Sequence, residues 1–150
     1  MAVGLRFEQK LRGTYHRLAD PAVELGAMLE TQVELRMVDL LRGRDGRVSG
    51  RIRLDEYADS ELEGAFRLDL RERKIVYDFR FDASDGRARR FHGETVFELR
   101  RPVRTMEDLV GRIYDDETED ARFVIRVPLD VGTRRLLRTL RASLTRSLSY

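Results

Sequence analysis

The sequence has no cysteine, no tryptophan and only two histidines among its 150 residues. The lack of cysteine excludes disulfide bonds and thiolate metal ligands. His16 and His92 cannot hold zinc without several carboxylates, and their spacing matches no metal-binding motif. We therefore predict that the protein binds no metal and that both histidines lie on its surface.

Long apolar runs are also missing. No stretch approaches the roughly 20 apolar residues of a membrane-spanning helix. The N-terminus has no basic region followed by the apolar core of a signal peptide. These two absences predict a cytoplasmic protein.

An excess of one charge is missing as well, because 29 Lys and Arg nearly balance 27 Asp and Glu and leave a net charge of +2. Proteins that bind nucleic acids usually carry a larger, clustered basic excess, so we expect no nucleic-acid partner. The hydrophobic fraction of 41% still supports a packed core. A chain of this length is expected to form a single domain, residues 1–150.

Motifs that carry catalysis are absent too. The glycines do not follow the order of a phosphate-binding loop or a dinucleotide fingerprint, so no cofactor is expected. Ser143, Ser147 and Ser149 have neither a nucleophile elbow nor a histidine partner. An isomerase or cyclase would need a carboxylate that points into the core, and the pattern offers none clearly. We therefore assign no catalytic residue and predict that the protein is not an enzyme.

What the sequence does contain is an alternation of apolar and charged residues with period two, which is typical of half-buried β-strands. Charged residues occupy one side of this alternation, and they are expected to form a solvated outer wall with cross-strand ion pairs. The clearest segments are residues 5–15, 50–54, 64–70, 75–82, 93–99, 109–113 and 123–127.

Residues 25–41 allow two interpretations. Leu25, Leu29, Val33, Met37 and Leu41 form a row with helical spacing, and Asp20 with Pro21 would suit a helix start. The same stretch also alternates with period two and contains β-branched residues. We prefer a strand here and keep the helix as the alternative.

Turn signals organise these segments into a meander. Asp85-Gly86 is a strong hairpin signal, Asp45-Gly46 is a second one, and an acidic loop is expected at residues 115–120. Glycine recurs inside the strands, as expected where a sheet bends or another backbone comes close. The sequence therefore predicts a mainly β fold, an antiparallel meander barrel of about eight strands.

The pattern changes to helical after Pro128. Leu136, Leu140 and Leu144 belong to one apolar stripe, with arginines on the remaining surface. We predict a C-terminal amphipathic helix over about residues 131–148. Because the stripe carries no Trp or Phe, we expect the helix to pack against the barrel rather than to bind a membrane surface.

The inward side of the barrel is the candidate binding site. An eight-stranded closed sheet has room for packed side chains or for one small ligand. An apolar lining with a few polar groups is the usual design of a small-molecule site, although a filled core is equally consistent with the pattern. The predicted ligand-binding residues are Gln9, Tyr15, Thr31, Tyr77, Phe79, Thr95 and Phe97.

Several short motifs together resemble a known family: FEQKLRG (7–13), VSG (48–50), YDFRF (77–81), FHG (91–93) and the closing segment 134–141. They are similar to the calycin-like, lipocalin-like β-barrel domain that accompanies GMC-type, cholesterol-oxidase-like flavin oxidoreductases in bacteria. The chain departs from that pattern at Gln9, where the family usually has an acid, and at Leu11, where it has methionine. The resemblance implies a non-catalytic barrel associated with lipid or sterol metabolism, and it supplies no catalytic residue.

Two functional hypotheses follow. The first is a non-enzymatic barrel that binds a hydrophobic, lipid-like or sterol-like small molecule in its interior. The alternative is a structural or interaction module that docks onto a partner enzyme, such as an oxidoreductase, or associates with itself as a homo-oligomer.

Overall fold

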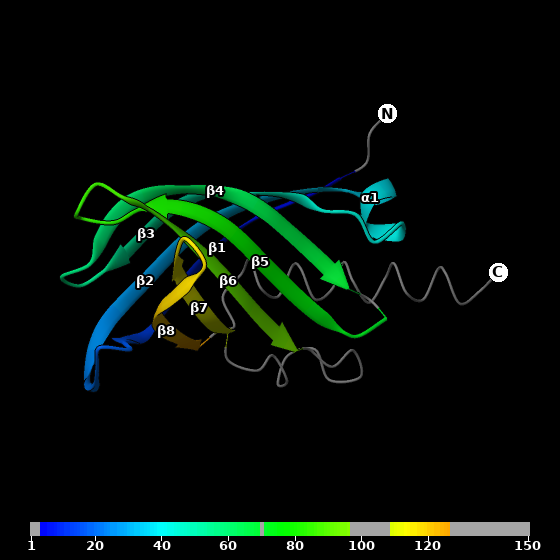
Figure 1. Cartoon of the computed structure of the whole chain (residues 1–150). Coiled ribbons are helices and arrows are strands. Elements are labelled where there is room, and N and C mark those ends of the chain that lie inside the picture. The colour runs from blue at the N-terminus through cyan, green and yellow to red at the C-terminus, as the bar shows by residue number, and fades with distance from the viewer. Residues whose placement is uncertain (1–3, 70, 97–108, 127–150) are drawn as a thin grey trace.

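The protein is a closed barrel of eight strands, as seen in a computed structural model that describes residues 4–69, 71–96 and 109–126 (Figure 1). Each strand pairs antiparallel with the next along the chain, and the last pairs with the first. The strands are β1 (Gly4–Arg17), β2 (Asp20–Arg36), β3 (Gly46–Leu54), β4 (Ala58–Asp69), β5 (Lys74–Asp82), β6 (Ala88–Val96), β7 (Leu109–Asp115) and β8 (Thr118–Arg126). One short helix, α1 (Met37–Leu41), follows β2.

The predicted mainly β, eight-stranded meander barrel is thereby confirmed. Residues 25–36 belong to a strand, as preferred, and only the last part of the ambiguous stretch turns helical, in α1. The predicted helix at residues 131–148 lies outside the described residues. No helix among those described is long and apolar enough to cross a membrane.

The register of the strands sets the tilt of the barrel. From His16 on β1, a row of directly paired residues runs around the barrel through β8, β7, β6, β5, β4, β3 and β2. It returns to β1 at Arg6, ten residues before His16. A stagger of this kind accompanies a strand tilt of about 35–45°. An eight-stranded barrel then has an interior that side chains can fill, and one continuous apolar core occupies it here.

Glycines let aromatic rings and backbones approach closely, as the sequence suggested. Gly93 and Gly111 face each other across β6 and β7, and a Cβ on either would collide with the ring of Phe91. Gly50 has a φ of 144°, and a side chain there would overlap the carbonyl oxygen of Glu30. These positions therefore require glycine for steric reasons.

The turns are confirmed at one predicted position and differ at two others. Asp85-Gly86 lies in the β5–β6 turn, where Gly86 has a φ of 80°. The prediction at Asp45-Gly46 was less accurate, because α1 occupies the connection between the paired strands β2 and β3. The acidic loop predicted at 115–120 is shorter than expected: a turn at residues 116–117 joins the strands, because β7 continues through Asp115 and β8 begins at Thr118.

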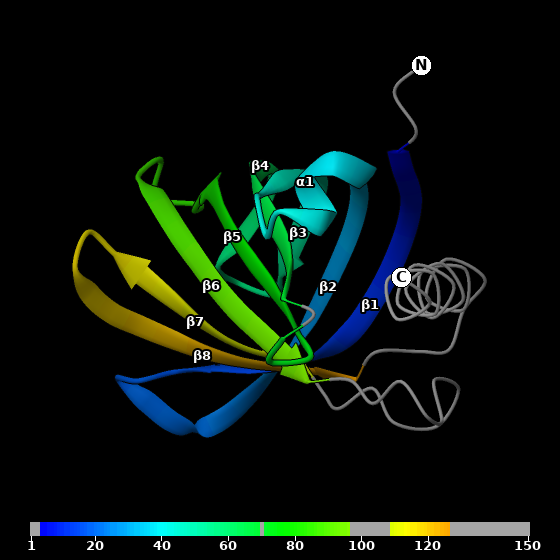
Figure 2. The same cartoon turned by 90° about the vertical axis from the view of Figure 1, so that its right-hand side faces the viewer.

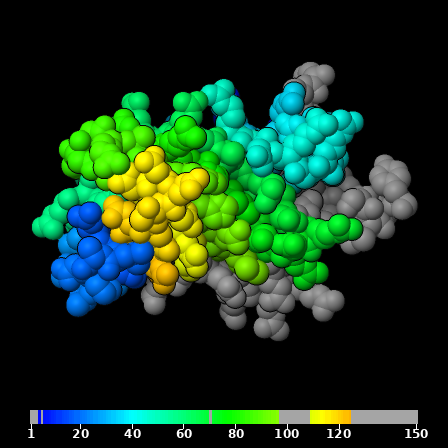
Figure 3. Space-filling view, viewed as in Figure 1, coloured from blue at the N-terminus to red at the C-terminus, as the bar shows by residue number. Residues whose placement is uncertain are grey.

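The barrel has two different ends, at the right and the left of Figure 1, and Figure 2 views it from the right-hand end. At one end lie α1 and the β4–β5 connection, and we call it the α1 end. At the opposite end the turns β1–β2, β3–β4, β5–β6 and β7–β8 come together, and we call it the Arg89 end after the buried arginine found there. In the space-filling view, the hairpins β1–β2, β5–β6 and β7–β8 lie against one another at this end (Figure 3).

Candidate functional site

The predicted site residues mostly face the core. Six of them are at most 2% exposed: Gln9, Tyr15, Thr31, Tyr77, Phe79 and Thr95. The seventh, Phe97, lies outside the described residues. Their inward orientation agrees with the alternation in the sequence, whereas their role in binding a ligand stays a prediction.

Gln9 and Tyr77 meet across the barrel interior. The Tyr77 hydroxyl on β5 donates a hydrogen bond to the side-chain oxygen of Gln9 on β1. The ring of Phe66 packs edge-on against Tyr77 at 5.1 Å between centroids, and against Phe7 at 5.6 Å. This half of the interior thus combines aromatic walls with two bonded polar groups.

Thr31 lies directly beside Gln9, since the two residues are partners in the β1–β2 register. Its hydroxyl oxygen is buried and has no hydrogen-bond partner. The other buried side-chain polar atom without a partner among the described residues is the Nε of Arg67, which belongs to a partly exposed side chain. A buried hydroxyl without a partner costs about 1–3 kcal/mol, and such groups are rare in native structures.

The remaining predicted residues divide between other parts of the core. Thr95 faces inward on β6, opposite Ile75 and diagonal to Tyr77. Phe79 stacks on Phe91 at 4.5 Å and belongs to the packed aromatic core. Tyr15 lies at the Arg89 end, where its hydroxyl donates to the backbone oxygen of Asp55. The structure therefore brings Gln9, Thr31 and Tyr77 together, with Thr95 near them, and separates Tyr15 and Phe79 from that group.

Sequence reasoning missed a buried ionic network at the Arg89 end. Arg89 is only 5% exposed, and its Nε donates to the Tyr57 hydroxyl at 2.8 Å. Its terminal nitrogen also donates to Asp85 at 2.7 Å. A signal was available in the sequence. Arg89 lies two and four residues before the inward-facing Phe91 and Gly93 on β6, so the alternation of the strand predicts that Arg89 also points inward.

Tyr57 links this network to a second hairpin. Its hydroxyl donates to Asp120 at 2.5 Å while accepting from Arg89, and its backbone oxygen accepts from the Ser84 amide at 2.8 Å. Burial, reinforced by the hydrogen bond to Asp120, raises the pKa of Tyr57. Burial alone would lower the pKa of Arg89, but the hydrogen bonds to Asp85 and Tyr57 outweigh it and raise that pKa.

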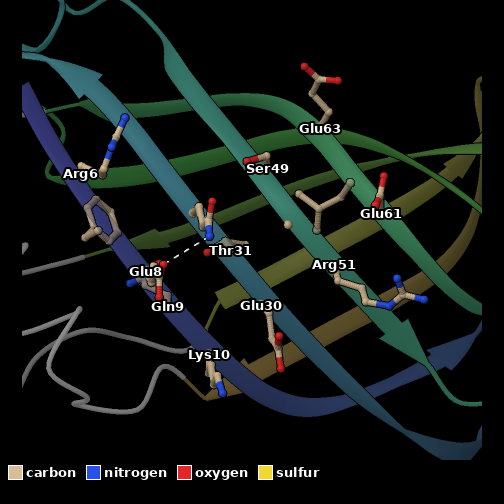
Figure 4. Close-up of a pocket in the computed structure, with 14 residues that line it drawn as sticks. Arg6, Glu8, Gln9, Lys10, Glu30, Thr31, Ser49, Arg51, Glu61 and Glu63 are labelled. Carbon is tan, nitrogen blue, oxygen red and sulfur yellow. Dashed lines mark hydrogen bonds between the residues drawn. The ribbon is translucent and has the colours of Figure 1, made fainter.

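The outer wall is charged, as predicted. Asp78 accepts two hydrogen bonds from Arg90 and lies 3.1 Å from His92, and Arg90 and then His92 hold the pKa of Asp78 below its usual range despite partial burial. A trough of about 1050 Å³ runs over β1 to β4, on the strands that carry Gln9 and Thr31 (Figure 4). Charged side chains such as Glu8, Glu30 and Arg51 border the trough. Among the described residues, no group of acids and histidines is arranged to hold a metal ion.

Scans of protein-family models, of curated proteins and of solved structures each find no match to this chain. The similarity to calycin-like domains therefore stays a prediction from the motifs.

Proposed function

We propose that the protein is a non-enzymatic β-barrel that binds a hydrophobic small molecule within its α1 end. In this proposal the apolar part of the ligand packs among Phe7, Phe66 and neighbouring side chains. A single polar group of the ligand forms a hydrogen bond with Thr31, beside Gln9 and Tyr77.

The observation that carries the proposal is the unpaired hydroxyl of Thr31. Valine would occupy the same space without burying a polar atom, so the hydroxyl lowers the stability of the empty barrel. A ligand that supplies the missing hydrogen-bond partner would remove this cost in the bound state. Sites that bind small molecules typically combine an apolar lining with a few such polar groups.

Binding also requires a local rearrangement. Gln9, Thr31 and Tyr77 are each at most 2% exposed, so a ligand reaches them only when neighbouring side chains move. Movement is easier to accommodate at the α1 end, because the hairpins at the other end are tied together through Tyr57 and Arg89. The ligand is therefore expected to enter from the α1 end.

The test is native mass spectrometry of the purified full-length protein, together with analysis of its organic extract. We expect a bound apolar compound that is retained by the wild type and by Ser49→Ala, which removes an exposed hydroxyl from the outer face of β3. Thr31→Val should retain less of it. Failure to bind any member of a panel of apolar compounds would contradict the proposal.

A second candidate, a module that self-associates, is favoured by exposed valines on the outer wall. Val110 and Val124 are direct partners across β7 and β8 and are 56% and 43% exposed. Light scattering after size exclusion would detect a dimer in the wild type, and Val110→Glu should make it a monomer. A wild-type protein that is strictly monomeric would contradict this alternative.

A further inference from the structure

We infer that the ligand is a neutral amphiphile carrying one hydroxyl or carbonyl group, and that the site discriminates against carboxylates of the same length. The inference rests on the proposed function and adds the chemical class of the ligand. It follows from the charges and hydrogen-bonding groups that face the interior of the barrel.

Buried charge is scarce among the residues that the structure describes. Only Asp39 and Arg89 have buried charged side chains there. Asp39 lies on α1 and is paired with Arg36 at 2.8 Å. Arg89 lies at the opposite end, where Asp85 and Tyr57 accept its hydrogen bonds. Among the described residues, no buried cation therefore lies beside Thr31, and the cations that border the trough, such as Lys10 and Arg51, are on the exposed outer wall.

The polar groups near Thr31 suit a neutral partner. A threonine hydroxyl can donate one hydrogen bond and accept others. Gln9, the partner of Thr31 in the β1–β2 register, already accepts the hydrogen bond of the Tyr77 hydroxyl. A ligand hydroxyl could donate to Thr31 or accept from it, and a ligand carbonyl could accept from Thr31.

A carboxylate in the same place would lose its hydration without gaining a counter-charge. Burial of an ionised group is unfavourable unless it is paired with an opposite charge and hydrogen-bonded. The same apolar chain should therefore bind well with a neutral head group and poorly with an anionic one.

The experiment compares three probes with chains of equal length: 1-decanol, methyl decanoate and decanoate, titrated into the full-length protein at pH 7.5 and followed by calorimetry. We expect both neutral probes to bind at least about tenfold more tightly than decanoate, which corresponds to roughly 1.4 kcal/mol. Methyl decanoate separates the effect of charge from that of the carbonyl group.

Thr31→Val should weaken binding of 1-decanol about tenfold, as expected for the loss of one hydrogen bond, and should leave decanoate almost unchanged. Ser49→Ala is the matched control and should bind all three probes as the wild type does. Equal or tighter binding of decanoate would overturn this inference while leaving the proposed function intact. Failure of all three probes, and of larger apolar compounds, would overturn both.

Discussion

The two ends of the barrel bury polar groups in opposite ways. At the Arg89 end, the Tyr57 hydroxyl both accepts from Arg89 and donates to Asp120. At the α1 end, the Thr31 hydroxyl is equally hidden and has no partner. Within one fold, the first arrangement stabilises the closed barrel and the second lowers its stability. We therefore interpret the Tyr57 hydroxyl as a structural polar group and the Thr31 hydroxyl as a candidate binding group.

The location of each group along its strand explains the difference. Tyr57, Asp85 and Asp120 lie in turns or near strand ends, where side chains from different hairpins can reach one another. Thr31 lies within β2, between β1 and β3, where the neighbouring backbone groups take part in the sheet. A short side chain in the middle of a sheet finds few free acceptors. A ligand is then the natural source of a partner.

Removal of the buried Arg89 cation should have the largest effect on the difference between the two ends. Arg89→Met should destabilise the protein by about 2 kcal/mol, because Tyr57 and Asp85 lose their partner. This cost is below that of a fully buried ion pair because Asp85 is half exposed. Urea unfolding monitored by circular dichroism measures it. Arg87→Met, at an exposed ion pair with Asp115, is the control and should have little effect.

Tyr57→Phe tests the same end with a smaller change. Removal of one hydroxyl leaves Arg89 and Asp120 without their shared partner, so the free energy of unfolding should fall by about 1–2 kcal/mol. The same denaturation measurement applies. Unchanged stability would mean that water replaces the hydroxyl without cost.

Alkaline pH should weaken the Arg89 end. Burial raises the pKa of Tyr15 to about 12, and burial also raises the pKa of Tyr57. A phenol with a higher pKa in the folded state contributes stability that is complete below the unfolded value of about 10 and is lost as the pH rises through the folded value. The urea midpoint should therefore decrease from pH 9 to pH 11.5, and less steeply in Tyr57→Phe. Ionisation of all five tyrosines near pH 10 in the folded protein would contradict this.

Thr31→Val is the matching change at the α1 end and should have the smallest effect, with the opposite sign. Because the hydroxyl has no partner, its removal should raise the stability of the ligand-free protein by up to about 1 kcal/mol. Thermal unfolding of carefully delipidated protein measures this. A clear loss of stability would show that the hydroxyl is hydrogen-bonded in solution and would remove the main support for the binding site.

Part of the candidate site could be predicted from parity along the strands. Alternation assigned Gln9, Thr31 and Tyr77 to the inner face, and all three are buried. It could not show that Tyr15 belongs to the opposite end, because parity gives the face of a strand and not the height along the barrel. Arg89 was missed because charged residues were expected on the outer wall, although its parity pointed inward.

The sequence by itself determined which face of each strand is apolar, because successive side chains of a strand point to opposite sides. Only the tertiary structure decided which polar groups meet. Tyr77 and Gln9 are 68 residues apart, and Tyr57 and Asp120 are 63 apart. Their contacts depend on the ten-residue stagger that closes the barrel, and this stagger is a property of all eight pairings together.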